Sequence, residues 1–119
     1  MLTDSAIAQL RADVLAADYT LDGLTERLGS AAIAALARNT SVAAARALGD
    51  ATDPQADAIR LWLLQLPVPA QRLANWTSLP ALKAAGLVVG DAELRATIEL
   101  KPHGSDRREG WICSDHTPL

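Results

Sequence analysis

The sequence predicts one α+β domain, mostly helical, in which a winged-helix-like group of helices precedes a C-terminal antiparallel β-hairpin or three short strands. Three observations predict this class. Apolar residues recur at helical spacing in several short stretches between positions 4 and 85. Proline and glycine separate these stretches. Apolar and polar residues then alternate over residues 93–101, which is typical of a half-buried strand.

The first half, residues 1–50, is predicted to form a layer of short helices. Thr20 and Ser30 are placed to cap two of them, and Gly29 is placed to close the second in the left-handed conformation. Each piece is too short to be stable alone, so the layer must pack on the second half. The predicted spans are 4–17, 21–28, 31–38 and 42–48.

The second part, residues 54–114, is predicted to be winged-helix-like. Asp53 followed by Pro54 is the clearest helix start in the chain. The predicted buried stripe of that helix is Ala56, Ile59, Leu63 and Leu66, with Trp62 beside it. Helices are predicted at 54–66, 69–73 and 79–85, strands at 87–89, 93–101 and 110–114, and a polar loop at 102–110. Residues 1–114 are therefore predicted to form a single N-terminal domain, and residues 115–119 are predicted to begin a linker.

Composition indicates a soluble cytoplasmic protein with no membrane partner. The net charge is −3, the one cysteine excludes an internal disulfide, and the N-terminus lacks the basic and apolar regions of a signal peptide. No apolar run approaches the roughly 20 residues that span a bilayer.

No catalytic, cofactor-binding or metal-binding residue is predicted in this chain. His103, His116 and Cys113 lie in the loop, the tail and the last strand, without supported partners for a hydrolytic triad. One cysteine and two scattered histidines cannot supply four zinc ligands. No glycine-rich phosphate loop occurs.

Nucleic-acid binding is the function that a winged helix most directly suggests, because its third helix reads DNA. The corresponding helix here, residues 79–85, carries one charge, and acidic residues offset the bases of the predicted wing. Arg107 and Arg108 are placed to contact phosphate or to lie solvated in a loop, and Trp111 to pack against a following domain. These three are the candidate contacts to a substrate or another domain. The alanine-rich helical face also allows a homodimer.

The order of short motifs along almost the whole chain resembles a known family. It is similar to the N-terminal accessory domain of actinobacterial S-adenosylmethionine-dependent methyltransferases, whose catalytic part belongs to the "methyltransferase small" group, near the release-factor glutamine methyltransferases. The motifs are Leu10-Arg11-Ala12-Asp13, Tyr19-Thr20-Leu21-Asp22-Gly23, Leu28-Gly29, Ala34-Ala35-Leu36-Ala37-Arg38, Ile59-Arg60-Leu61-Trp62-Leu63-Leu64, Pro67-Val68-Pro69, Ala84-Ala85-Gly86-Leu87-Val88, Ile98-Glu99-Leu100-Lys101-Pro102-His103-Gly104 and Trp111-Ile112-Cys113-Ser114-Asp115.

The resemblance implies a substrate-recognition or dimerisation domain that is inactive alone. Its partners would be its own C-terminal catalytic domain, a methyl-acceptor substrate (protein or RNA) and a second copy, and S-adenosylmethionine would bind the missing domain. That domain's Asn-Pro-Pro-aromatic motif is not in this chain, because neither Asn39 nor Asn75 is followed by proline. The alternative is a free-standing winged-helix transcriptional regulator or nucleic-acid-binding protein.

Overall fold

The computed structural model describes residues 4–38, 41–104 and 109–113, with side chains given up to Pro102 except at Ala37. The helices are α1 (Asp4–Ala16), α2 (Leu21–Leu28), α3 (Ser30–Ala37), α4 (Val42–Leu48), α5 (Pro54–Ala58), the π-helical turn η1 (Ile59–Leu63), α6 (Ala70–Leu73) and α7 (Leu79–Ala84). The strands are β1 (Val68–Pro69), β2 (Val88–Gly90), β3 (Glu93–Ala96), β4 (Leu100–Gly104) and β5 (Glu109–Cys113).

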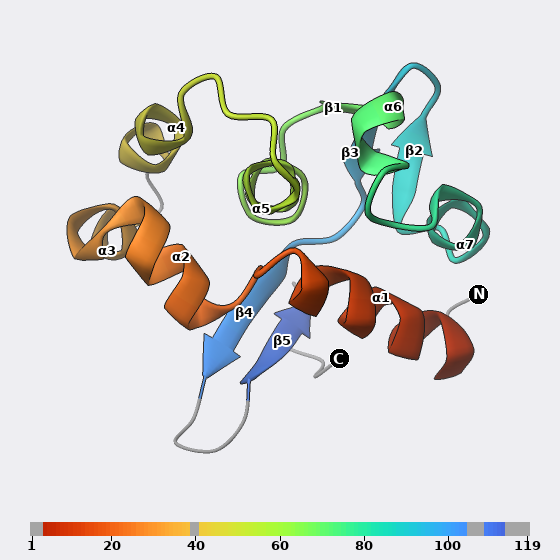
Figure 1. The fold of residues 1–119 in the computed structure, drawn as a ribbon, viewed down its shortest axis with the longest axis horizontal. Helices are drawn as coiled ribbons and strands as arrows, with labels where there is room; N and C mark the ends of the chain where they lie inside the picture. Colours follow the sequence, from red (N-terminus) through yellow and green to blue (C-terminus); the bar gives the residue numbers. More distant parts are fainter. Residues whose placement is uncertain (1–3, 39–40, 105–108, 114–119) are drawn as a thin grey trace.

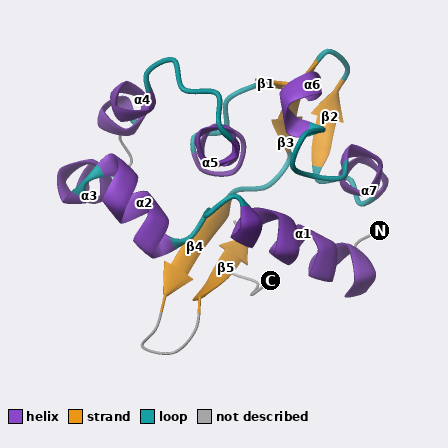
Figure 2. Ribbon diagram, in the orientation of Figure 1, coloured by secondary structure: helices purple, strands orange, loops and turns teal. Residues whose placement is uncertain are grey.

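The helix α5 and its continuation η1 lie at the centre of the molecule (Figure 1). Helices α2, α3 and α4 lie on one side of them, and β1, β2, β3, α6 and α7 lie on the other. Helix α1 and the β4–β5 hairpin cover a third side. The strands therefore form two separate antiparallel sheets, of order β1-β3-β2 and β4-β5 (Figure 2). The predicted α+β class is confirmed.

Local capping chemistry fixes the ends of several helices. The Thr20 hydroxyl accepts a hydrogen bond from the Gly23 amide, and the Asp53 carboxylate accepts one from the Ala56 amide, as the sequence predicts. Gly86 closes α7 at φ 73°, also as predicted.

The α2–α3 junction departs from the prediction. Gly29 has the expected positive φ, but its ψ of 156° is extended and not left-handed helical. The capping role predicted for Ser30 is wrong: Gly29 occupies the N-cap position and Ser30 is already inside α3. The reason is that a single residue separates the two helices, so one glycine both ends α2 and begins α3.

The central helix differs most from its prediction. The predicted 54–66 helix is regular only to Ala58 and then widens into η1, where the Leu64 amide bonds to the Ile59 carbonyl five residues earlier. The wider turn changes which side chains face inward. Leu61 and Trp62 are fully buried, whereas Leu63 is half-buried and Leu66 is 41% exposed. Beyond Ile59 the predicted stripe is wrong at Leu66, whereas Leu63 packs against the core but is only partly buried.

The strand prediction is corrected in three places. The predicted strand 93–101 is two strands in different sheets, broken at Thr97, whose hydroxyl donates to the Gly86 carbonyl. The predicted loop begins too early, because residues 102–104 belong to β4. The short β1 was not predicted, and it pairs Val68 with Leu94. The order of three helical segments followed by a hairpin is observed, and likeness to a winged helix stays a prediction.

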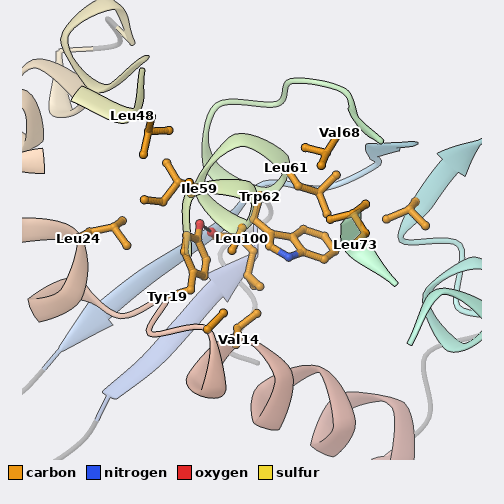
Figure 3. Close-up of a cluster of buried hydrophobic side chains, with 14 of the residues drawn as sticks. Val14, Tyr19, Leu24, Leu48, Ile59, Leu61, Trp62, Val68, Leu73 and Leu100 are labelled. Atoms are coloured by element: carbon orange, nitrogen blue, oxygen red, sulfur yellow. Dashed lines mark hydrogen bonds between the residues drawn. The ribbon is translucent and has the colours of Figure 1, made fainter. Parts of the chain in front are cut away.

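The hydrophobic core joins both halves of the chain. In Figure 3, Trp62, Tyr19 and Leu100 lie at its centre, with Val14 below and Leu73 on the side of α6. All five are fully buried. Because α1, η1, α6 and β4 each contribute a side chain, the helical layer and the sheets form one core.

A buried ion cluster adds a second connection. Asp57, on α5, is 1% exposed and accepts hydrogen bonds from Arg60 Nη1 at 2.8 Å and Arg72 Nη2 at 3.0 Å. Arg72 Nε also lies 3.0 Å from Asp57 Oδ2, in an ion-pair contact outside hydrogen-bond geometry. Arg60 donates further to the carbonyls of Gly49 and Ala51. The cluster thus ties α5 and α6 to the end of α4.

Within the described residues, none of the helices has both the length and the apolar composition needed to cross a bilayer.

Candidate functional site

A cleft opens between the helical layer, the end of η1 and β4. Its volume is about 430 Å³, which lies in the range of small-ligand and side-chain pockets. Aliphatic side chains from three segments form its walls. They are Leu21 and Leu24 of α2, Ile33 and Leu36 of α3, and Leu63 and Leu64 at the end of η1. Five of the six are only partly buried, so the walls are open to solvent.

Four polar side chains and Pro102 complete the cleft. Ser41 precedes α4, Gln65 follows η1, and Glu99 and Lys101 flank the first residue of β4. The Glu99 carboxylate lies 3.6 Å from the Lys101 ammonium. This pair is long and partly exposed, so it contributes little to stability and leaves both charges accessible to a ligand. The described lining therefore combines apolar walls with one negative and one positive charge.

The π-helical turn creates the wall on the η1 side. A regular helix would turn about 100° per residue, and the extra residue in a π-turn rotates everything after it. Here Leu61 and Trp62 fill the core, and Leu63 and Leu64 turn toward the cleft. Single π-turns occur often at functional sites. This one places two leucines where an α-helix would not.

Gln65 ends the turn in a left-handed backbone conformation, with φ 59°. This conformation is uncommon for a residue with a side chain and is found at functional positions. The Gln65 side chain offsets the cost, because its Nε2 donates to the carbonyls of Trp62 and Ile98, both at 3.1 Å. Its Oε1 accepts no hydrogen bond from any described residue, so it is an available acceptor at the cleft.

Tyr19 positions the opposite wall. The tyrosine is fully buried, and its hydroxyl donates a hydrogen bond to the Leu100 carbonyl, which fixes β4 against the α1–α2 connection. Burial, and to a smaller extent the charge of Glu99, raise the pKa of Tyr19 well above its ordinary value. The hydroxyl therefore stays protonated, keeps donating, and holds the strand segment that carries Glu99 and Lys101.

The sequence-predicted contact residues lie elsewhere or outside the described part of the chain. Arg107 and Arg108 lie outside the described residues. The backbone of Trp111 lies in β5, directly opposite Pro102 of the cleft, and its side chain is outside the described ones. Sequence reasoning missed Gln65 and the placement of Leu63 and Leu64 in the cleft, because no local pattern marks a π-turn. The linker predicted at 115–119 also lies outside the described residues.

Metal-binding side chains do not gather at the described part of this site. Over the described ranges, no three side chains of the kind that ligate metals lie together. The backbones of His103 and Cys113 lie in β4 and β5, and neither side chain is among those described. The described cleft side chains can bind and orient a ligand through apolar contact, one amide acceptor and two opposite charges.

Comparison with known proteins shows a family but no close relative. No curated protein and no solved structure matches the chain significantly. A family model described as a domain of unknown function, DUF7059, matches residues 16–98, which run from the end of α1 past β3 and include the six aliphatic wall residues. Because this match spans well over half of the 119 residues, the chain belongs to the DUF7059 family.

Proposed function

We propose that this domain is the N-terminal substrate-recognition domain of an actinobacterial, cytoplasmic, S-adenosylmethionine-dependent methyltransferase, with the cleft as its recognition site. The observation that carries the proposal is the 430 Å³ cleft, in which a π-turn and a left-handed Gln65 present leucines and an amide acceptor to solvent. The order of sequence motifs that resembles the accessory domain of these enzymes supports the link to methyl transfer.

The cleft favours recognition over dimerisation as the role of the domain. A dimer interface between two copies needs about 800 Å² of complementary surface per partner. A concave site with convergent polar groups suits a smaller inserted group. The domain would hold part of the acceptor, and the methyl group would move on the separate catalytic domain, where S-adenosylmethionine binds.

The nucleic-acid-binding alternative is not supported by the helix on which it depends. Helix α7 has the sequence Leu79-Pro80-Ala81-Leu82-Lys83-Ala84, in which Lys83 is the one side chain able to donate to a base edge or a phosphate. Sequence-specific readout needs several such donors on one helix.

The experiment has two parts. The reading frame after the Leu119 codon is sequenced for a glycine-rich βαβ unit and an Asn-Pro-Pro-aromatic motif. The full-length product, a form lacking residues 1–114 and the 119-residue chain are then compared for S-adenosylmethionine binding by calorimetry and for transfer of labelled methyl groups to protein and RNA acceptors. We expect the truncated form to bind the cofactor without methylating the acceptor, and the 119-residue chain to do neither.

Two results would overturn the proposal. One is a reading frame that continues into no methyltransferase domain. The other is a truncated enzyme that methylates its acceptor as fast as the full-length protein, since the domain would then have no part in recognition.

A further inference from the structure

We propose that the cleft binds a polypeptide segment by taking up two neighbouring aliphatic side chains, while Gln65 accepts a hydrogen bond from the segment's backbone. This deepens the proposed function, on which its biological meaning rests, by naming the ligand class. The binding itself is measurable on the 119-residue chain without any methyl transfer.

The size and walls of the cleft fit aliphatic side chains. A sealed apolar cavity of about 150 Å³ accommodates a benzene ring, so a cleft of about 430 Å³ has room for two branched side chains and the backbone between them. Its walls come from α2, α3 and η1 and consist of leucine and isoleucine. Transfer of aliphatic groups from water to such walls is favourable in proportion to the area buried.

The polar groups fit a peptide backbone. The Gln65 Nε2 is already bonded to protein carbonyls, whereas its Oε1 accepts no hydrogen bond from the described part of the chain and can accept one from a peptide N–H. The Ser41 hydroxyl, at an exposed position on the same cleft, can donate or accept. Glu99 and Lys101 balance each other in charge, so the site matches the neutral dipoles of a peptide and not a fixed net charge.

The same features argue against a nucleotide in the cleft. Single-stranded nucleic acid is held by aromatic side chains that stack on bases and by a basic groove along the phosphates. Of the lining side chains that the structure describes, none is aromatic, and the one cation, Lys101, lies beside Glu99. An RNA ligand is therefore an outcome that the test must be able to reveal.

The test is an NMR titration of the ¹⁵N-labelled 119-residue chain. The probe is N-acetyl-Leu-Leu-N-methylamide, and the comparison ligands are N-acetyl-Gly-Gly-N-methylamide and a uridine trinucleotide. We expect saturable shifts of the Leu64, Gln65 and Lys101 amides with the leucine peptide, and none with the other two ligands. Any one of three results would overturn the proposal. The leucine peptide gives no saturable shift, or the glycine peptide shifts the same amides equally, or the trinucleotide shifts them more strongly.

A blocking variant and a matched control make the test specific. Ser41→Trp puts an indole at an exposed position on the cleft, so it should lower the affinity for the leucine peptide about tenfold or more. Leu15→Gln changes a leucine that is 53% exposed on α1, outside the cleft, and should leave binding unchanged. If the spectrum shows that the Ser41 variant does not fold, Leu36→Gln is used as the blocking variant, and it too should lower the affinity for the leucine peptide about tenfold or more. A folded cleft variant with undiminished binding contradicts the proposal.

Discussion

Replacing Asp57 by asparagine should destabilise the protein strongly, because it removes the negative charge that two arginines share. The carboxylate is 1% exposed, and Arg60 and Arg72 approach it at 2.8 and 3.0 Å. Breaking a buried ion pair by removing one partner costs about 3–5 kcal/mol. Since the Arg72 side chain is 34% exposed and water can partly solvate it, we expect about 2–4 kcal/mol for this site.

The assay is equilibrium unfolding in urea. With a slope of about 2 kcal/mol per molar urea for a small domain, the expected loss lowers the midpoint by roughly 1–2 M. The expected loss of about 2–4 kcal/mol in the free energy of unfolding is a large part of the 5–15 kcal/mol by which a domain is typically stable.

Asp53→Asn is the matched control. It makes the same chemical change in the Asp53–Arg27 pair, whose side chains are 43% and 25% exposed, and asparagine still caps α5. We expect a loss of less than about 1 kcal/mol. Equal, small shifts of the two midpoints would refute the assignment of a buried charge cluster to Asp57.

Three further predictions follow from the packing. Gly23→Ala should cost about 1–3 kcal/mol in urea unfolding, because the added Cβ would lie 2.4 Å from the Asp18 carbonyl oxygen; unchanged stability would mean that the α1–α2 turn is looser than described. Leu61→Ala should lower the free energy of unfolding by about 2–5 kcal/mol because the side chain is fully buried, and Leu66→Ala by far less because it is 41% exposed. A larger loss for Leu66→Ala than for Leu61→Ala would contradict the π-turn and support the regular helix that the sequence predicts. Because folding raises the pKa of Tyr19, the protonated hydroxyl contributes to the free energy of unfolding. The contribution is fully present below the pKa of about 10 that tyrosine has in the unfolded chain, and it is lost as the pH rises from there toward the pKa in the folded protein. Unfolding followed from about pH 9 to 11 should therefore show a decline that Tyr19→Phe reduces, and identical declines would contradict the burial of the hydroxyl.

Features decided by neighbouring residues could be predicted from the sequence. The Thr20 and Asp53 caps depend on hydrogen bonds over three residues, and the Gly86 turn depends on the freedom of glycine to take positive φ. The alternation from Leu94 to Leu100 also holds, since both ends are buried although they belong to different sheets.

Features decided by contacts distant in the sequence could not be predicted. The π-turn forms where the core accepts both Leu61 and Trp62, and a helical pattern in the sequence carries no sign of which turn will widen. β1 is two residues long and exists through pairing of Val68 with Leu94. The cleft escaped prediction for the same reason, because its walls come from segments that meet only in the folded chain.

The central claim to be tested is the proposal that the cleft recognises the methyl acceptor of a methyltransferase to which this domain belongs. The most direct measurement is kcat/KM for acceptor methylation by the full-length protein carrying Ser41→Trp, with Leu15→Gln as control and S-adenosylmethionine affinity measured in parallel. We predict a fall in kcat/KM of about tenfold or more in the Ser41 variant alone, with unchanged cofactor affinity. Undiminished methylation by that variant, with its cleft shown to be blocked toward the leucine peptide, would contradict the claim.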